Sequence, residues 1–307
     1  MKGPDCLLGA HFSIAKGLDR ALYTAAGYGC SAVQIFTKNA STWKERVLSD
    51  EDIRRFEAAR KRTGITRIAS HTSYLINPAS DEKKKSAMSR EALKQELVRC
   101  AALDIPFVVL HPGSHRGSGV AAGIARIVSV IRAVFDALPG NPVRLLLETT
   151  AGQGAGIGHR FEQIADIMAG VENGDRLGVC LDTCHVFAAG YDLRTEAAYR
   201  ETFQAFDAVI GLERLYWIHV NDSARELGAR VDRHAHIGRG FIGETAFRML
   251  MGDRRLRHIP KVLETPKGDG EGDWDEINLK RLKSFCVRDG EASPSRRGFY
   301  RRTRRSS

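Results

Sequence analysis

A carboxylate and an imidazole stand at the end of one apolar run in a position where they could ligate a metal ion. The run Leu177–Leu181 stops at Asp182, and His185 follows three residues later. Such a run is typical of a parallel strand that is buried on both faces. The alternative is an ordinary turn, in which Asp182 caps the next helix and His185 lies at the surface. Whether other strands end in the same way decides between the two.

Residues of the same types recur at the ends of other predicted strands. Asp232 and His234 lie two residues apart in a long polar loop, so both side chains can face one way from an extended segment. Any one of these residues alone would be unremarkable, but their repetition favours a metal site. The candidate metal ligands are therefore nine. Three are His185, Asp232 and His234, and six lie at strand ends: His71, His111, Glu148, Asp182, His219 and Glu264.

These candidate ligands offer only nitrogen and oxygen atoms, which suits Zn²⁺ and also admits Mn²⁺ or Fe²⁺. A catalytic zinc ion takes about three protein ligands and a water molecule, so the set fits two or three ions that share a carboxylate. Such ions activate water and hold the attacking and leaving oxygens of a displacement at phosphorus. The cluster therefore suits phosphodiester hydrolysis, and a two-metal sugar isomerase is the alternative.

Repeated strand–helix units would position these residues. Helical spacing of apolar residues is found, among other places, in Ile53–Ala59, Ala87–Leu103, Ala121–Leu138, Phe161–Val171 and Ala197–Ile210. Strands are predicted at Leu7–His11, Ala32–Phe36, Arg67–His71, Phe107–His111, Arg144–Glu148, Leu177–Asp182, Leu215–Val220 and Lys261–Thr265.

Strands that are buried on both faces and alternate with helices predict an α/β fold, a (β/α)₈ TIM barrel. We expect a single domain over residues 1–286, with the strand ends meeting at one mouth. An open doubly wound sheet would usually carry a glycine-rich turn after its first strand, and the sequence from Leu8 to Ser13 does not fit that pattern.

Composition narrows the class of protein. The chain has 307 residues, 43% of them hydrophobic, enough for a large core. No apolar run approaches the ~20 residues of a membrane span, and no signal peptide is evident. The six cysteines are scattered, so we expect no disulfide framework and a reducing cytoplasm. Cys180 and Cys184 are expected to be buried structural thiols rather than metal ligands.

The charge of the chain is compatible with a polyanionic partner. The formal net charge is +10, and part of it comes from an arginine-rich tail over residues 287–307. The tail lacks an apolar period and is predicted to be disordered. Two interpretations of the tail are open: it contacts phosphates, or it has no specific role.

Several longer motifs, in order, make the chain similar to the endonuclease IV family of apurinic/apyrimidinic endonucleases (AP endonuclease family 2, deoxyribonuclease IV). The resemblance runs from Gly9 to Thr265. The stretches that carry it are Phe36-Thr-Lys-Asn39, His71-Thr-Ser-Tyr-Leu-Ile-Asn77, His111-Pro-Gly-Ser-His115, Glu148-Thr-Thr-Ala-Gly-Gln-Gly154, Leu181–Asp192, His219-Val-Asn-Asp222 and Val231-Asp-Arg-His234.

The resemblance implies a zinc-dependent enzyme of base-excision repair. It would hydrolyse the phosphodiester on the 5′ side of an abasic site in double-stranded DNA, leaving a 3′-hydroxyl and a 5′-deoxyribose phosphate. We expect a monomer without a membrane partner. A two-metal sugar isomerase or epimerase on the same scaffold would have no evident use for Asp232 and His234.

The resemblance also assigns ligands to three zinc ions per chain, for which Mn²⁺ can substitute. Glu148 would bridge the first and second ions and would be the catalytic carboxylate that positions or activates the attacking hydroxide. The first ion would be held by His71, His111 and Glu148, the second by Glu148, Asp182, His219 and Glu264, and the third by His185, Asp232 and His234.

The DNA contacts implied by the resemblance are Tyr74 and Leu75, which would enter the helix, together with Lys38 and Asn39. Packing at the barrel mouth is the alternative for Tyr74 and Leu75. Ser41 stands where bacterial relatives often carry a DNA-inserting arginine. Either the penetration is weaker here or a nearby side chain compensates, the candidates being Trp43, Lys44 and Arg46. Two further departures from the family pattern also bear on DNA contacts. The cation that follows Asn221-Asp222 is displaced by one residue, to Arg225, and Arg239 adds positive charge near the barrel mouth.

Overall fold

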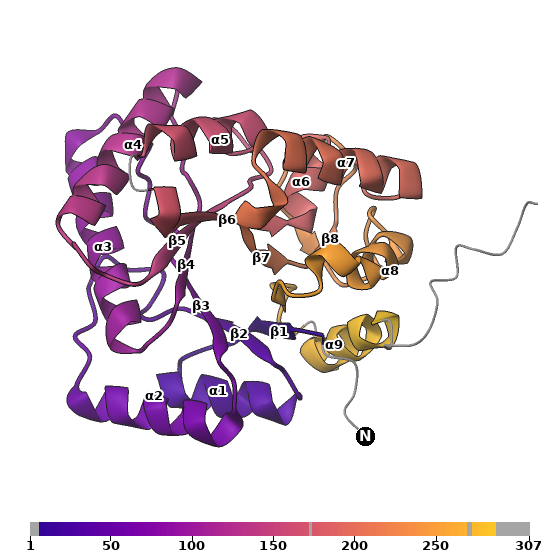
Figure 1. The fold of residues 1–307 in the computed structure, drawn as a ribbon, viewed down its shortest axis with the longest axis horizontal. Helices are drawn as coiled ribbons and strands as arrows, with labels where there is room; N and C mark the ends of the chain where they lie inside the picture. The colour runs from indigo at the N-terminus through magenta and orange to yellow at the C-terminus, as the bar shows by residue number, and fades with distance from the viewer. Residues whose placement is uncertain (1–5, 172–173, 269–271, 287–307) are drawn as a thin grey trace, which may run out of the picture.

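The computed structural model describes residues 6–171, 174–268 and 272–286, and it shows a closed barrel of eight parallel strands (Figure 1). β10 pairs with β1 and so closes the ring. The barrel strands are β1 (Leu8–His11), β2 (Ala32–Ile35), β3 (Arg67–His71), β4 (Phe107–Leu110), β5 (Arg144–Glu148), β6 (Leu177–Asp182), β7 (Leu215–His219) and β10 (Lys261–Leu263). The predicted TIM barrel is confirmed.

Helices surround the barrel (Figure 1). They are α1 (Leu18–Gly27), α2 (Asp50–Thr63), α3 (Lys83–Ala102), α4 (Val120–Asp136), α5 (Phe161–Gly170), α6 (Thr183–Ala189), α7 (Glu196–Val209), α8 (Glu244–Gly252) and α9 (Trp274–Phe285). Amphipathic spacing explains their docking: in α4, for example, Ile127, Ile131 and Val134 are buried against the barrel. None of the helices in the described ranges has the length and apolar character of a membrane span.

The inside of the barrel changes from apolar to polar towards its mouth. An apolar layer fills the interior, formed by Ala32, Ala69, Val109, Leu146, Cys180, Trp217 and Val262. Side chains alternate along a strand, so the residue two positions later points into the same interior, nearer the mouth. In these strands that residue is Gln34, His71, His111, Glu148, Asp182, His219 or Glu264. The apolar residues inside the barrel therefore determine that these polar side chains also point inward, towards one another.

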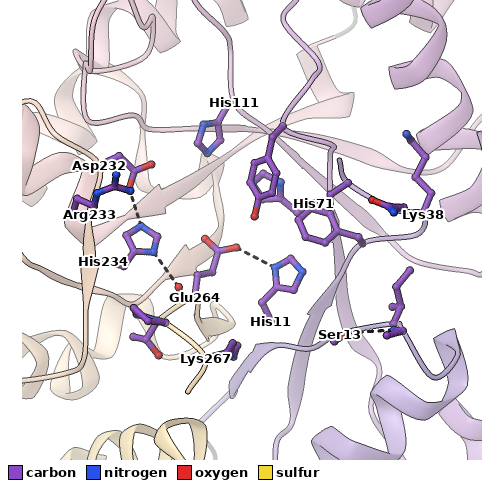
Figure 2. Close-up of a pocket in the computed structure, with 18 of the residues that line it drawn as sticks. His11, Ser13, Lys38, His71, His111, Asp232, Arg233, His234, Glu264 and Lys267 are labelled. Carbon is purple, nitrogen blue, oxygen red and sulfur yellow. Dashed lines mark hydrogen bonds and ion pairs between the residues drawn. The ribbon is translucent and has the colours of Figure 1, made fainter. Parts of the chain in front are cut away.

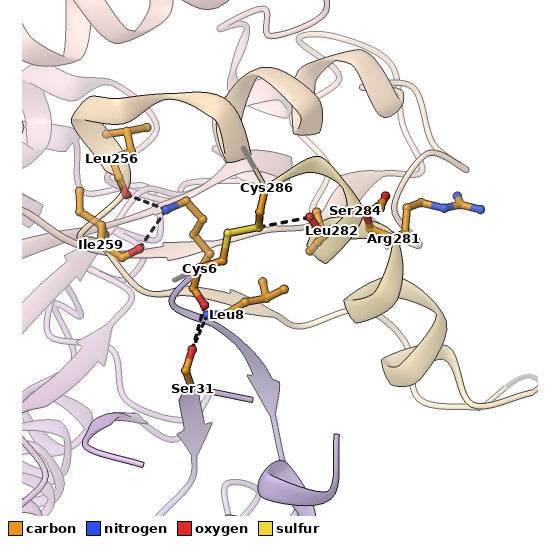
Figure 3. Close-up of a disulfide and its surroundings, with 10 residues drawn as sticks. Cys6, Leu8, Ser31, Leu256, Ile259, Arg281, Leu282, Ser284 and Cys286 are labelled. Atoms are coloured by element: carbon orange, nitrogen blue, oxygen red, sulfur yellow. Dashed lines mark hydrogen bonds between the residues drawn. A yellow bond between two sulfur atoms is a disulfide. The ribbon is translucent and has the colours of Figure 1, made fainter. Parts of the chain in front are cut away.

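One expectation about the cysteines is wrong. Cys6, just before β1, and Cys286, just after α9, form a disulfide that joins residues 280 positions apart, with their Cα atoms 6.5 Å from each other (Figure 3). Barrel closure explains the pairing, because α9 packs against β1. The remaining cysteines are free and buried, including Cys180 and Cys184 as expected. The predicted tail, 287–307, lies outside the described residues.

The disulfide predicts the thiol count of the purified chain. Denatured protein that has never met a reductant should titrate four thiols, and reduced protein all six. Because the cross-link restricts the unfolded chain, its reduction should lower the free energy of unfolding by about 2–4 kcal/mol. The Cys6→Ser/Cys286→Ser variant is the control, and its stability should not respond to reductant. Six reactive thiols before reduction would contradict the disulfide.

Candidate metal centre

The structure brings all nine predicted ligand residues to the mouth of the barrel. Glu148 lies at their centre and is fully buried. His71 Nε2 lies 3.0 Å and His111 Nε2 2.9 Å from its Oε2, while His219 Nδ1 lies 2.9 Å from Oε1. Within the described residues, five groups have ligand atoms within 4.8 Å of one another, and two of these include Cys180 or Cys184. The other three contain the residues of the three predicted sets: His71, His111 and Glu148; Glu148, Asp182, His219 and Glu264; and His185, Asp232 and His234.

The second ring nitrogen of four histidines is held by a hydrogen bond to a backbone carbonyl or to the side chain of Gln34. These bonds join His71 Nδ1 to Thr72 O (2.8 Å), His185 Nδ1 to Thr149 O (2.8 Å), His219 Nε2 to Gln34 Oε1 (2.8 Å) and His234 Nδ1 to Glu264 O (3.1 Å). Each bond fixes the ring and leaves the other nitrogen facing the carboxylates. Metal-binding histidines are oriented in this way.

Two buried nitrogens test whether the residues fit a cation. His185 Nε2 and His234 Nε2 have no hydrogen-bond partner, and they lie 3.2 and 3.4 Å from the carboxylate of Asp232. Buried polar atoms without partners are unfavourable. A cation between these two imidazoles and the carboxylate would satisfy all three, so the donor set fits a metal ion.

Asp182 has two structural roles at once. Its Oδ1 caps α6 by accepting from His185 N at 2.8 Å, and its Oδ2 accepts from Asn221 Nδ2 at 2.6 Å. The alternative interpretation of this stretch, an ordinary turn, is correct that Asp182 caps the next helix. It is wrong that His185 lies at the surface, because that ring is buried. Since the carboxylate of Asp182 is fixed from both sides, it needs no rearrangement to face the cluster.

Sequence reasoning missed three polar residues of this site. His11 Nδ1 lies 3.2 Å from Glu264 Oε1, and Gln34 Nε2 donates to the same oxygen at 2.5 Å. Asn221 Oδ1 accepts from Glu264 N at 2.8 Å. His11 ends the first predicted strand, so the strand-end criterion would have found it there. Gln34 could have been found from its place two residues after the inward-facing Ala32.

The cluster opens into a cavity of about 820 Å³ (Figure 2). Figure 2 shows His71, His111, His234 and Glu264 facing a common space. Three cationic side chains, Lys38, Arg233 and Lys267, also line the cavity. A cavity with ligand-type residues at its base and cations on its walls is suited to an anionic substrate.

The predicted DNA-contact residues differ in their exposure. Tyr74 is 74% exposed at the rim of the cavity, with its ring edge-on to Phe36 at 5.5 Å, whereas Leu75 is half-buried. Asn39 is exposed. Lys38 is buried, and its Nζ donates to Thr42 O at 2.5 Å, so its ammonium group holds its own loop in place.

Trp43, Lys44 and Arg46, in the loop that follows Lys38, are the candidates to replace the missing arginine, and two of them are engaged in other contacts. Trp43 packs against the core, and Arg46 pairs with Asp52 at 3.0 Å. Ser41 and Lys44 are exposed. Lys44 is therefore the exposed cation among the three candidates.

The ionisable groups of the cluster predict how the stability of the metal-free protein depends on pH. Burial lowers the pKa of His185, but Asp182, Asp232 and Glu148 outweigh it and hold the pKa well above its usual value. The resulting stabilisation is present below about pH 6.5 and is lost as the pH rises through the raised pKa. In urea unfolding with chelator, the free energy of unfolding should fall from about pH 6.5 upward.

Two variants test the origin of that slope. His185→Gln should reduce the loss of stability at rising pH, because the proton-binding ring is gone. His258→Gln removes an exposed imidazole far from the cluster and should retain the full slope. Equal slopes in both variants would show that the cluster is not the source.

Known proteins resemble this chain closely. The family model AP_endonuc_2, described as a xylose isomerase-like TIM barrel, matches residues 22–285. The probable endonuclease 4 of Geotalea daltonii is 45% identical over 278 residues, covering 91% of this chain and 97% of the relative. The probable endonuclease 4 of Chloroflexus aggregans is 46% identical over 280 residues, covering 90% and 96%.

Solved structures agree. Endonuclease IV from Thermus thermophilus has a TM-score of 0.80 and 37% identity, covering 91% of this chain and 98% of that one. A D-tagatose 3-epimerase-like protein, with a TM-score of 0.67 and 19% identity, covers 90% of this chain and 96% of its own and shows the shared fold alone. The chain therefore belongs to the endonuclease IV family of apurinic/apyrimidinic endonucleases.

Proposed function

We propose that this enzyme holds three zinc ions and hydrolyses the phosphodiester on the 5′ side of abasic sites in double-stranded DNA, in base-excision repair. The products would be a 3′-hydroxyl and a 5′-deoxyribose phosphate. The observation that carries the proposal is the grouping of nine ligand side chains in three sets at one cavity. Their nitrogen and oxygen atoms suit zinc, and Mn²⁺ can substitute.

Glu148 would be the catalytic carboxylate. Burial opposes its charge, but the imidazoles of His111 and His219 hold the pKa of Glu148 well below its usual range, so it stays ionised. Its two oxygens face different histidines, which places the carboxylate between the first two ligand sets. From there the ionised carboxylate can accept a hydrogen bond from the attacking water and so orient it. The ions, when bound, would lower the pKa of that water and stabilise charge on the phosphate.

The walls of the cavity would bind the DNA. Phosphates attract cations irrespective of base sequence, and Arg233 is an exposed cation on the cavity wall. The exposed ring of Tyr74 is available to stack where a base is missing, and Leu75 adjoins it. Asn39 and Lys44 are exposed on the neighbouring loop, while Lys38 would act by shaping that loop. Chemistry at an abasic nucleotide requires such access outside the helix.

We further propose that the enzyme acts as a cytoplasmic monomer, in which Cys6–Cys286 is a single cross-link beside four free buried thiols rather than a disulfide framework. All nine ligand side chains come from one chain, so a second copy is not needed to complete the site. The sugar epimerase alternative shares the fold, but Asp232 and His234 then have no role. Turnover of abasic DNA, with none of ketose sugars, separates the two activities.

Replacement of Glu148 tests the catalytic proposal. Glu148→Gln keeps the size of the side chain but removes the charge, and the rate of nicking of an abasic duplex should fall by about 10²–10⁴-fold. The far-ultraviolet spectrum should stay unchanged. Glu162→Gln, on an exposed face of α5, is the matched control and should nick at the normal rate.

The same purified protein tests the metal proposal. Elemental analysis should find about three zinc ions per chain, in line with the ligand sets. Undiminished nicking after complete metal removal would overturn the mechanism.

Replacement of Tyr74 tests the DNA proposal. Tyr74→Ala removes the exposed ring and should weaken binding of an abasic duplex by roughly 1–3 kcal/mol, the usual worth of a stacked base. Tyr74→Phe retains the ring and should bind normally. Fluorescence anisotropy with abasic and intact duplexes measures both. Equal loss in the two variants would assign the effect to the hydroxyl rather than to stacking.

A further inference from the structure

A long loop between β7 and α8 carries two of the three residues in the third ligand set, Asp232 and His234. The other ligands lie on the barrel strands, at their ends or, for His185, in α6. Within the loop, a short antiparallel pair joins β8 (Asp222–Ser223) to β9 (His234–Ala235). Some feature of the chain must therefore hold this loop where its two ligands reach His185.

The carboxylate of Asp222 fastens the beginning of this loop to its end. It is fully buried, and four backbone N–H groups donate to it. Its Oδ1 accepts from Ser223 at 2.8 Å and from Ile242 at 3.0 Å, and its Oδ2 accepts from Gly238 and Gly240 at 3.0 Å each. Charge-assisted bonds of this kind are strong, and none of these donors is a side chain that can swing away.

Gly240 allows this close approach. A β-carbon there would lie 2.3 Å from Ser223 O and 2.4 Å from Asp222 Oδ1, closer than real contacts permit. Phe241 N also donates to Ser223 O, at 2.8 Å. The two ends of the loop are therefore packed directly against the Asp222 carboxylate.

The fastened ends direct the ligands between them. Ser223 is paired with His234 in the short sheet, and Ala224 N donates to Arg233 O at 2.9 Å. Asp232 and His234 flank Arg233, so displacement of the strand would move both ligands together. Farther along, Gln153 Oε1 accepts from Asp232 N at 3.0 Å.

We propose that Asp222 is a positioning residue for the third metal ion, acting through the loop that presents Asp232 and His234 to His185. The inference rests on the three-ion site proposed above and deepens it. The neighbouring Asn221 serves different ligands, because its side chain contacts Asp182 and Glu264 of the second set. Two adjacent residues thus position two different parts of the centre.

Zinc binding by an Asp222→Asn variant tests this proposal. The amide cannot accept at its nitrogen, so about half of the four backbone bonds should be lost while size is kept. Metal-free protein, refilled with Zn²⁺ and passed through a desalting column, should retain about two ions instead of three. Calorimetric titration should show the affinity for one ion reduced roughly 10–100-fold, as for other supporting groups of metal sites.

Two controls separate positioning from general stability. The first control is Asp253→Asn. The carboxylate of Asp253 also accepts from a backbone N–H, that of Arg255 at 3.0 Å, but it lies near the start of β10, at the end of the barrel opposite the metal centre. This variant should retain all three ions. Gly240→Ala forces the loop away from Asp222 without replacing any carboxylate and should lose the same ion as Asp222→Asn. Hydrogen exchange in metal-free protein should rise at residues 224–237 and remain slow in the barrel strands.

The outcomes are distinct. Three ions bound with normal affinity in Asp222→Asn would overturn the proposal, as would loss of the ion without faster exchange in the loop. If Asp222→Asn does not fold, the zinc content and exchange of Gly240→Ala decide in the same way. Failure of the unaltered enzyme to bind three ions or to nick abasic DNA would instead count against the proposed function.

Discussion

Two carboxylates, Glu148 and Asp182, have no exposed surface inside the barrel mouth, and the rest of the site depends on their neutralisation. A buried carboxylate is strongly unfavourable unless charges and hydrogen-bond donors replace water. Imidazole rings surround the carboxylate of Glu148. The side chain of Asn221 and the backbone N–H of His185 donate hydrogen bonds to the carboxylate of Asp182. Without metal, protons must provide the positive charge. A shared cation does this without protons, so the condition for burying the carboxylates is also the condition for a metal centre.

The barrel satisfies this constraint through the alternation of its strands. Each strand that places an apolar side chain in the interior also places the residue two positions later on the same side. Trp217 and His219 show the connection: the indole fills the core, and the imidazole above it reaches Glu148. A substitution in the apolar layer would therefore disturb the ligands as well as the packing. Stability and chemistry share the same strands in this molecule.

Features set by local sequence could be predicted, whereas features set by barrel closure could not. Strand ends such as Glu148 and Asp182 follow from apolar runs, and their convergence follows from the fold. The Cys6–Cys286 disulfide depends on α9 returning beside β1, which no spacing along the chain reveals. The inward turn of Lys38 likewise depends on an irregular loop, in which Glu45 lies 3.6 Å from its ammonium and is itself held by Arg99.

The three ligand sets also differ in how firmly the fold holds them. Glu148 and His219 are on buried strands, so moving them requires deformation of the barrel itself. Asp232 has a side chain that is 42% exposed and belongs to a loop whose shape depends on hydrogen bonds to one buried carboxylate. The position of the loop-borne ligands Asp232 and His234 therefore depends on hydrogen bonds within the loop, whereas that of Glu148 and His219 depends on the barrel itself.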